Sequence, residues 1–327
     1  MAPLAVSLGD PAGVGPELIA AAWARREDLA LPPFAVVGGA GIFEALGVPV
    51  GRIAGIGAAP DAWATSLPVL DFGDAPYTPG KPDLDGGRLA LTSLRRAVAL
   101  TIDGEAAALV TMPIAKAELS KVGFAHPGQT EFIAEACGVL PADAVMMLAG
   151  PSLRAVPLTV HCALADVPGL LSTALIVGKG RIVAEALRRD FGIAAPRLAV
   201  CGLNPHAGEQ GRMGREDAEI VAPAVAALQA VGIEATGPHP ADALFTPRAR
   251  ASYDAALAMY HDQALIPVKA LDFDAGVNVT LGLPIVRTSP DHGTAFDIAG
   301  KGIADPGATI AAIRMAAQCA ARRCAYV

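Results

Sequence analysis

Residues 198–231 read LAVCGLNPHAGEQGRMGREDAEIVAPAVAALQAV and predict a strand, a polar loop and a helix in succession. The short apolar run Leu198–Cys201 is typical of a strand that is buried on both faces. Gly, Asn and Pro then interrupt the pattern, as they do in loops. From Arg215 to Val231, apolar residues recur at helical spacing. The stretch is therefore one strand–loop–helix unit of an α/β protein.

The same alternation runs through the rest of the chain. Strands are predicted at Leu4–Leu8, Phe34–Val37, Val69–Phe72, Ala107–Thr111, Ala155–Val160, Ala255–Met259 and Ile285–Arg287. Helices are predicted at Pro16–Arg26, Gly87–Asp103, Ser172–Arg189 and Asp305–Arg323. Strands that alternate with helices in this way indicate an α/β fold with a largely parallel sheet.

Length and composition limit the class of protein. A chain of 327 residues is long for one core, so two lobes are expected. Charged residues make up only 17%, which suggests that a partner subunit covers part of the surface. The net charge is −7 and the sequence has no Lys/Arg run, which disfavours nucleic-acid binding. No charge-free apolar stretch reaches the roughly 18 residues that span a bilayer, so no membrane segment is expected.

The cysteines and the N-terminal sequence indicate where the protein works. The five cysteines are odd in number and form no CxxC pair, which argues against a disulfide framework and a cysteine zinc site. The sequence MAPLAVSLGD lacks the features of a signal peptide. A reducing, cytoplasmic location is therefore expected.

Three histidines lie just beyond predicted strands. They are His161, His206 and His261. Ligands of open α/β sheets bind outside the carboxyl ends of strands, so the three imidazoles could converge there. Three histidines with one open position are the ligand set of a catalytic divalent metal. The alternative is that each one is an ordinary packed or solvent-facing histidine.

Cations and an amide follow in the next part of the chain. Lys269 and Arg287 come at the end of apolar runs that resemble strands, and Asn278 lies within Gly-Val-Asn-Val-Thr. A lysine and an arginine at strand ends suit the binding of a phosphate or carboxylate. Surface cations that cap strands are the competing interpretation.

Several motifs together resemble one family, the 4-hydroxythreonine-4-phosphate dehydrogenases. The motifs are Gly9-Asp-Pro-Ala-Gly-Val-Gly-Pro-Glu17, Leu203-Asn-Pro-His-Ala-Gly-Glu209, Gly237-Pro-His-Pro-Ala-Asp242, Met259-Tyr-His-Asp-Gln263 and the block from Gly276 to Lys301. They span nearly the whole chain. The resemblance implies NAD-dependent oxidation of 4-phosphooxy-L-threonine to 2-amino-3-oxo-4-phosphooxybutanoate. That product then loses carbon dioxide to give 3-amino-2-oxopropyl phosphate, a step of pyridoxal 5′-phosphate synthesis.

The resemblance also implies a set of site residues and a partner. It implies that His161, His206 and His261 bind one divalent cation, with zinc expected first and cobalt or magnesium as alternatives. It implies that the substrate is contacted by Thr130, Lys269, Asn278 and Arg287. It further implies a homodimer in which the two subunits share the active site.

A more distant resemblance concerns the cofactor. The segment His292–Lys301 is similar to the adenosine-binding loop of isopropylmalate and isocitrate dehydrogenases, and Gly9–Glu17 is similar to their N-terminal loop. The alternative is an ordinary turn before the last helix. This resemblance implies a two-lobe, three-layer α/β/α fold with a cleft between the lobes. The lobe with the NAD loop would contain about residues 1–125 and 285–327, and the metal and dimerisation lobe about residues 126–284.

Within that loop, the residues expected to bind the cofactor are His292, Gly293, Thr294 and Asp297. NADP-type isocitrate dehydrogenases carry Lys-Tyr where this chain has Asp297-Ile298. A carboxylate there would repel a 2′-phosphate and could accept a hydrogen bond from a ribose hydroxyl. NAD is therefore the expected cofactor, with NADP as the alternative.

The chain departs from the family pattern at one position. The family commonly has Gly-His-Thr-Glu-Phe where this chain has Gly128-Gln-Thr-Glu-Phe132. Gln129 can donate a hydrogen bond to the substrate but cannot become cationic near neutral pH. His126 is a candidate to compensate for the missing imidazole.

Several residues fit the role of general acid or base, and several substrates fit the sequence. Candidates for the general acid or base are Asp242, Asp262 and Lys116, although the two aspartates could instead orient the histidine ligands. Competing substrates are 4-phospho-threonate or 4-phospho-erythronate, and a cyclic diol carboxylate. A phosphotransacetylase-like acyltransferase is the competing function from another class.

Overall fold

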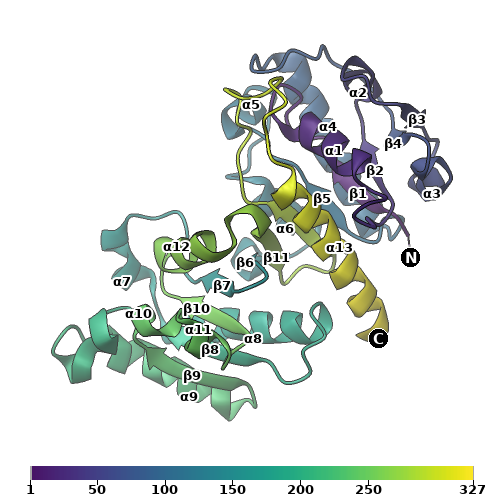
Figure 1. The fold of residues 1–327 in the computed structure, drawn as a ribbon. Coiled ribbons are helices and arrows are strands. Elements are labelled where there is room, and N and C mark those ends of the chain that lie inside the picture. The colour runs from purple at the N-terminus through teal and green to yellow at the C-terminus, as the bar shows by residue number, and fades with distance from the viewer. Residues whose placement is uncertain (1, 327) are drawn as a thin grey trace. The chain divides into compact units, whose positions relative to one another are not determined.

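The computed structural model describes residues 2–326, which fall into two compact units. The first contains the residues up to Pro141 together with Leu283–Cys324, and the second contains Ala142–Gly282 and the residues after Cys324. In Figure 1 the first unit is purple to blue and ends in yellow, and the second is teal to green. The first unit is thus built from two distant parts of the chain.

The first unit contains a parallel sheet with the strand order β3-β4-β2-β1-β5-β12. These strands are β1 (Leu4–Ser7), β2 (Phe34–Val37), β3 (Val50–Arg52), β4 (Leu67–Leu70), β5 (Leu109–Thr111) and β12 (Arg287–Pro290). The α-helices are α1 (Gly15–Ala24), α2 (Ala40–Ala45), α3 (Ala59–Trp63), α4 (Leu84–Ile102), α5 (Lys116–Lys121), α6 (Gln129–Ala136) and α13 (Gly307–Tyr326). β1, β2 and most of β4 are fully buried, which explains their continuous apolar sequences.

The second unit contains a mixed sheet with the strand order β11-β6-β7-β10-β8-β9. Its strands are β6 (Val145–Ala149), β7 (Arg154–Pro157), β8 (Arg197–Cys201), β9 (Glu234–His239), β10 (Ala255–Ala258) and β11 (Val277–Leu281). β6 is antiparallel to both of its neighbours, and the pairs from β7 to β9 are parallel. The α-helices are α7 (Val167–Leu170), α8 (Thr173–Arg189), α9 (Ala222–Ala230), α10 (Ala241–Leu244), α11 (Pro247–Arg250) and α12 (His261–Asp272).

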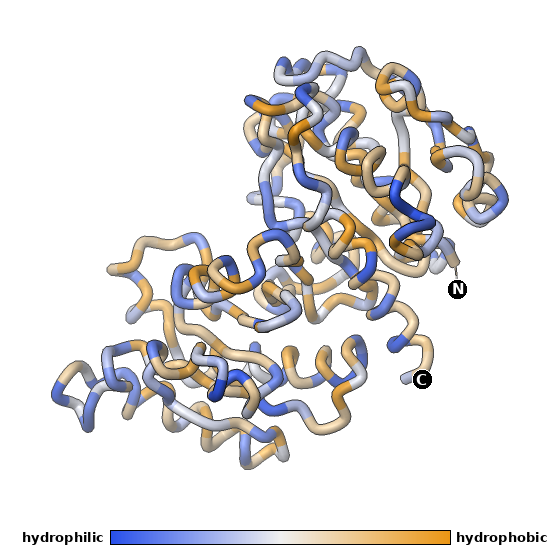
Figure 2. Tube along the Cα trace, in the orientation of Figure 1, coloured by the Kyte–Doolittle hydropathy of each residue, from blue (hydrophilic) through white to orange (hydrophobic). Residues whose placement is uncertain are grey.

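The predicted α/β class and the largely parallel strands are confirmed. Figure 2 shows hydrophilic and hydrophobic residues alternating along the helices, as expected for helices with one buried face. The helix expected at Arg215–Val231 begins as a π-helical turn at Asp217–Val221 and continues as α9. The prediction missed β3, β6, β9 and β11.

Two site residues lie in other elements than expected. Lys269 does not follow a strand, because His261–Asp272 forms helix α12. Ala264, Leu265 and Val268 are buried there while Ile266 is exposed, which is a helical and not an alternating pattern. Arg287 begins strand β12 instead of ending a strand.

The boundary between the units also differs from the expected one. Residues 126–141 were expected in the metal lobe but belong to the first unit. The reason is that α6 packs on that unit: the Phe132 ring lies 5.7 Å from the Phe124 ring, and Gln129 Nε2 donates to the Met112 carbonyl.

Two further expectations concern cysteines and membrane segments. All five cysteines are free thiols.

Among residues 2–326, no single helix is long and apolar enough to cross a membrane. Only the sharply bent pair Leu164–Leu170 and Thr173–Arg189 meets that test when the two helices are taken together.

Helix α4 offers a test of the packing in the first unit. Leu94 is completely buried, whereas Leu84 at the start of the same helix is 47% exposed. Leu94→Ala should lower the free energy of unfolding by about 2–5 kcal/mol, because it leaves a cavity. Leu84→Ala should change it by less than about 1 kcal/mol. Urea unfolding followed by circular dichroism measures both, and equal losses would contradict this packing.

Candidate active site

Three neighbouring parallel strands of the second unit deliver the three predicted histidines. β10 lies between β7 and β8 and pairs with both. His161 follows β7, His261 follows β10 and His206 follows β8. Because the three strands are parallel, all three histidines leave the sheet at its carboxyl edge, where ligands of such sheets bind.

His161 and His261 lie side by side at this edge. Their ring centroids are 5.7 Å apart and the ring planes are tilted by 45°. The Nδ1 atom of His261 is 2.7 Å from Asp262 Oδ1, so Nε2 is the nitrogen that remains for a ligand. Both imidazoles, with Tyr260 and Cys162, line a cavity of about 430 Å³.

His206 is placed differently. It lies in the loop Pro205–Gly211, where residues 206–210 have positive φ values. The φ of His206 is 52°, and its side chain is exposed. Between residues 2 and 326, no group of three or more His, Cys, Asp or Glu side chains is close enough to hold a metal ion. The structure therefore brings two of the three predicted ligands together, and the three-histidine site stays a prediction.

Buried hydrogen bonds fix the ends of these strands. The Gln263 side chain accepts from the Met259 amide at 2.6 Å and donates to the Gly202 carbonyl at 2.8 Å. It thereby joins the end of β10 to the end of β8. Thr159 donates to the Met259 carbonyl at 2.8 Å and joins the segment that leads to His161 to the same point.

Asp217 holds the start of the His206 loop. Its buried carboxylate accepts from the amides of Leu203 and Asn204 at 2.7 and 3.1 Å, and from Asn204 Nδ2 at 3.0 Å. Gly208 approaches this carboxylate so closely that a Cβ would lie 3.3 Å from Oδ2. The loop backbone is thus fixed up to the residues that flank His206.

A half-buried amine lies beside the end of β7. Lys179 on α8 donates from Nζ to the Leu158 carbonyl at 2.8 Å. Burial lowers the pKa of Lys179. This lysine, Thr159, Gln263 and Asp217 were not predicted as site residues, because their roles are hydrogen bonds to backbone atoms distant in sequence.

The other predicted residues of the second unit come from three further elements, α10, α12 and β11. Asp242 is exposed on α10, which follows β9 and contacts the Pro205–Gly211 segment. Lys269 is exposed on α12. Asn278 lies on β11, opposite Leu148 of β6, and its Oδ1 is buried with no hydrogen-bond partner among the described residues.

In the first unit, Arg287 and Gln129 both form hydrogen bonds to residues at the end of β5. Arg287 is buried and donates from Nε and Nη2 to Thr111 Oγ1, at 3.1 and 2.7 Å. Gln129 donates to the carbonyl of the next residue, Met112, at 3.3 Å, and its buried Oε1 has no partner among residues 2–326. Burial lowers the pKa of Arg287 to about 10, so it stays cationic at neutral pH.

Two further predicted residues of the first unit, Thr130 and Lys116, lie at the starts of helices. Thr130 is the second residue of α6, and no side chain caps the start of that helix. Lys116 is the first residue of α5 and is exposed. His126 packs between the rings of Phe124 and Phe132, with centroid distances of 5.2 and 5.3 Å. It therefore belongs to an aromatic cluster.

The predicted cofactor loop follows β12. The Thr294 carbonyl accepts from the Val14 amide at 2.9 Å, so this loop packs on the N-terminal loop. His292 Nδ1 contacts the Gly293 carbonyl at 3.0 Å, and its buried Nε2 has no described hydrogen-bond partner. Asp297 is exposed. Its carboxylate is thus available to a ligand.

Asp10 is a buried carboxyl group near the same place. Its Oδ1 accepts from the Ala12 amide at 3.0 Å, and Oδ2 has no hydrogen-bond partner among the described residues. Burial raises the pKa of Asp10, and the charges of Glu118 and Asp83 act in the same direction. This burial could not be predicted, because Gly9-Asp-Pro resembles an exposed turn.

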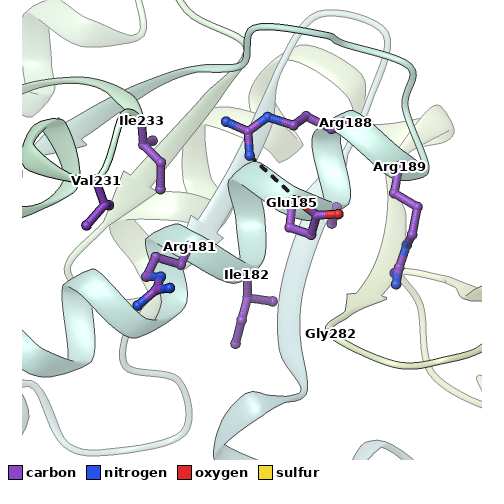
Figure 3. A pocket seen from close by; sticks show the side chains of 9 residues that line it. Arg181, Ile182, Glu185, Arg188, Arg189, Val231, Ile233 and Gly282 are labelled. Carbon is purple, nitrogen blue, oxygen red and sulfur yellow. Dashed lines mark ion pairs between the residues drawn. The ribbon is translucent and has the colours of Figure 1, made fainter. Parts of the chain in front are cut away.

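A second cavity of the second unit, of about 500 Å³, lies away from these residues (Figure 3). Its walls are α8 and the turn before β9, with Arg181, Arg188 and Glu185 among the lining residues. None of the predicted site residues lines it.

Comparison with known proteins gives consistent matches over the whole chain. Residues 41–316 match the family model described as pyridoxal phosphate biosynthetic protein PdxA. A 4-hydroxythreonine-4-phosphate dehydrogenase of Erythrobacter litoralis is 66% identical, over 98% of this chain and 97% of that protein. The crystal structure of the enzyme of that name from Klebsiella pneumoniae superposes with a TM-score of 0.86 at 38% identity, over 98% of both chains.

A terephthalate 1,2-cis-dihydrodiol dehydrogenase from Burkholderia xenovorans is less similar. Its crystal structure gives a TM-score of 0.67 at 29% identity, over 97% of this chain and 98% of that one.

The role of Gln263 can be tested with a matched pair of substitutions. Gln263→Met keeps the size of the side chain but leaves the Met259 amide and the Gly202 carbonyl unpaired, so the free energy of unfolding should fall by about 2 kcal/mol or more. Gln229→Met removes a single bond, from Nε2 to the Ala235 carbonyl. It should cost about 1 kcal/mol. Thermal and urea unfolding measure both, and a smaller loss for Gln263→Met would show that the strand ends do not depend on it.

Proposed function

The chain belongs to the PdxA family of pyridoxal phosphate biosynthetic proteins, and from this we propose that it is the NAD-dependent dehydrogenase of 4-phosphooxy-L-threonine. The reaction removes a hydride from the alcohol carbon and a proton from its oxygen. The 2-amino-3-oxo-4-phosphooxybutanoate formed loses carbon dioxide to give 3-amino-2-oxopropyl phosphate. The observation that carries the proposal is the 66% identity to an enzyme of that name over nearly the whole chain.

Arg287 supports an anionic substrate. Its guanidinium is buried and stays charged, and Thr111 fixes its orientation. Gln129 and the uncapped start of α6 lie next to Thr111–Met112, so free backbone N–H groups accompany the cation. We assign Gln129, Thr130 and Arg287 of the first unit to the binding of a phosphate or carboxylate of the substrate. For Lys269 and Asn278 of the second unit, the proposed substrate contact rests on the family resemblance alone.

The donor set at the carboxyl edge fits a divalent metal. His161 and His261 face each other, and Asp262 orients His261 through Nδ1 as carboxylates do for metal-bound histidines. His161, His261 and His206 would hold the ion, with zinc first and cobalt or magnesium as alternatives. Such an ion would supply Lewis-acid chemistry that lowers the pKa of an alcohol.

The first unit supplies the groups for the cofactor. The Thr294 carbonyl is held by the N-terminal loop, His292 has a buried nitrogen with no described partner, and Asp297 presents a free-standing carboxylate at the surface. These residues, with Gly293, fit the adenosine half of NAD, which would accept the hydride. We therefore assign NAD binding to the first unit and metal binding to the second.

The contacts of the acid–base candidates support different roles for them. Asp262 is bonded to His261, which favours an orienting role for it. Asp242 and Lys116 are exposed and have no such bond to a histidine within residues 2–326, so we propose them for proton transfer.

Exposed apolar residues near α12 support a homodimer. Ile266 and Phe273 are 64% and 74% exposed, and their seven-residue separation, about two helical turns, puts them on one side of the α12 region. Large exposed apolar side chains this close together are typical of protein interfaces. We propose that a second copy covers them, so that the two subunits share the active site. Free cysteines support a cytoplasmic location.

Gln129 supports a second candidate substrate. In a paralogous enzyme, its amide would bind a different phosphorylated acid, such as 4-phospho-threonate or 4-phospho-erythronate. A cyclic diol carboxylate is favoured less, because the diol dehydrogenase relative is 29% identical. Membership of the PdxA family argues against the phosphotransacetylase-like alternative.

Turnover of candidate substrates tests the proposed function. Wild-type protein should form NADH from 4-phosphooxy-L-threonine. The absorbance of NADH measures the rate. Arg287→Met should lower kcat/KM at least about 100-fold, because a charge-assisted contact is lost. Arg323→Met is the control, since it removes an arginine bonded to the Pro284 carbonyl in the same unit. Turnover of 4-phospho-threonate alone would contradict the proposed substrate and support the paralogue.

Asp297 predicts the choice between the two nucleotides. Wild-type kcat/KM should be higher with NAD than with NADP, because the carboxylate repels a 2′-phosphate. Asp297→Asn should narrow that preference by raising kcat/KM with NADP. Steady-state kinetics with both nucleotides measure it. Equal kcat/KM values of the wild type with NAD and with NADP would refute the role of Asp297.

A further inference from the structure

Three segments of the first unit hold one another around the predicted cofactor loop. They are the N-terminal loop 10–17, whose last three residues begin α1, the turn 77–81 and the cofactor loop 292–301. The Val14 amide donates to the Thr294 carbonyl at 2.9 Å, and the Gly80 amide donates to the Ala12 carbonyl at 2.8 Å. The N-terminal loop therefore binds both of the other segments.

Glu17 completes the connection. Its Oε1 accepts a hydrogen bond from the Gly300 amide and another, at 3.4 Å, from the Tyr77 hydroxyl. One carboxylate oxygen thus joins the far end of the cofactor loop to the turn 77–81. Burial and the Glu17 charge raise the pKa of Tyr77 to about 12, so its hydroxyl stays protonated and donates at neutral pH.

The packing between these segments leaves no room for side chains at three glycines. A Cβ on Gly13 would lie 2.8 Å from the Thr294 carbonyl oxygen, and one on Gly80 would lie 2.9 Å from the Phe296 carbonyl oxygen. A Cβ on Gly300 would lie 2.7 Å from the Pro79 ring. The turn 77–81 is therefore in direct contact with the cofactor loop.

The cofactor loop needs such support. It contains no regular strand or helix between β12 and α13. Ala295 has a φ of 44°, in the left-handed region that costs energy for a residue with a Cβ. A loop of this kind keeps one conformation only where its surroundings fix it.

We infer that Glu17 and Tyr77 are positioning residues for the dinucleotide, which hold the loop 292–301 in its binding conformation before the nucleotide arrives. The inference rests on the proposed NAD-dependent function. A loop ordered in advance binds its ligand more tightly, because less conformational entropy is lost on binding. Neither residue needs to touch the nucleotide for this effect.

The test compares four variants by NADH fluorescence titration and by amide hydrogen exchange without nucleotide. Glu17→Ala should weaken NADH binding about tenfold and speed exchange of the Gly300 amide by a similar factor, because its acceptor is lost. Tyr77→Phe should weaken binding about threefold. Glu17→Gln keeps a carbonyl acceptor and should restore both properties.

Tyr326→Phe is the matched control. It removes a comparable tyrosine–glutamate bond, from Tyr326 to Glu185 Oε1 at 3.3 Å, away from the loop, and should change neither property. In all variants kcat at saturating NAD should stay within about twofold of wild type, because affinity is what the loop controls.

Different results would contradict the positioning role and the proposed cofactor. Faster Gly300 exchange with unchanged NADH affinity in Glu17→Ala would overturn the positioning role alone. If Glu17→Ala does not fold, wild-type affinity in Tyr77→Phe overturns that role instead. Wild-type protein that does not bind NADH would overturn the proposed cofactor and, with it, this inference.

Discussion

The side chain of Gln263 makes the pair of hydrogen bonds on which the candidate metal site depends. By bonding to the Met259 amide and the Gly202 carbonyl, it fixes the end of β10 against the end of β8. Thr159 bonds to the Met259 carbonyl and brings the end of β7 to the same point. Three strands that end together can present three side chains to one ligand, which separate loops could not do without a large entropy cost.

In the first unit, hydrogen bonds likewise fix the side chains at the end of β5. Thr111 orients the buried guanidinium of Arg287, and the next residue, Met112, accepts from Gln129. The cofactor loop is held from the side by Glu17, Tyr77 and the N-terminal loop. In each unit, groups that would meet a ligand are fixed by hydrogen bonds from residues that would not meet it, and such preorganisation is what precise catalysis requires.

Much of this could be predicted from sequence, and the failures have physical causes. Strand–helix alternation predicted the α/β class, and the position of His161 and His261 after apolar runs predicted that they would lie together. Lys269 was misplaced because a short apolar run fits both a strand and a helix. Gln263 and Asp217 were missed because their partners are backbone atoms brought near only by the tertiary fold. The exposed, left-handed position of His206 carries no sequence signal.

The proposed metal site needs His206 to join His161 and His261 around one divalent ion. The most direct test is the metal content of purified wild-type protein and of the three single alanine variants, measured by inductively coupled plasma mass spectrometry after dialysis against metal-free buffer. We predict about one zinc, cobalt or magnesium ion per chain in the wild type and a large loss in every variant. Full metal content in His206→Ala, or none in the wild type, would contradict the three-histidine site.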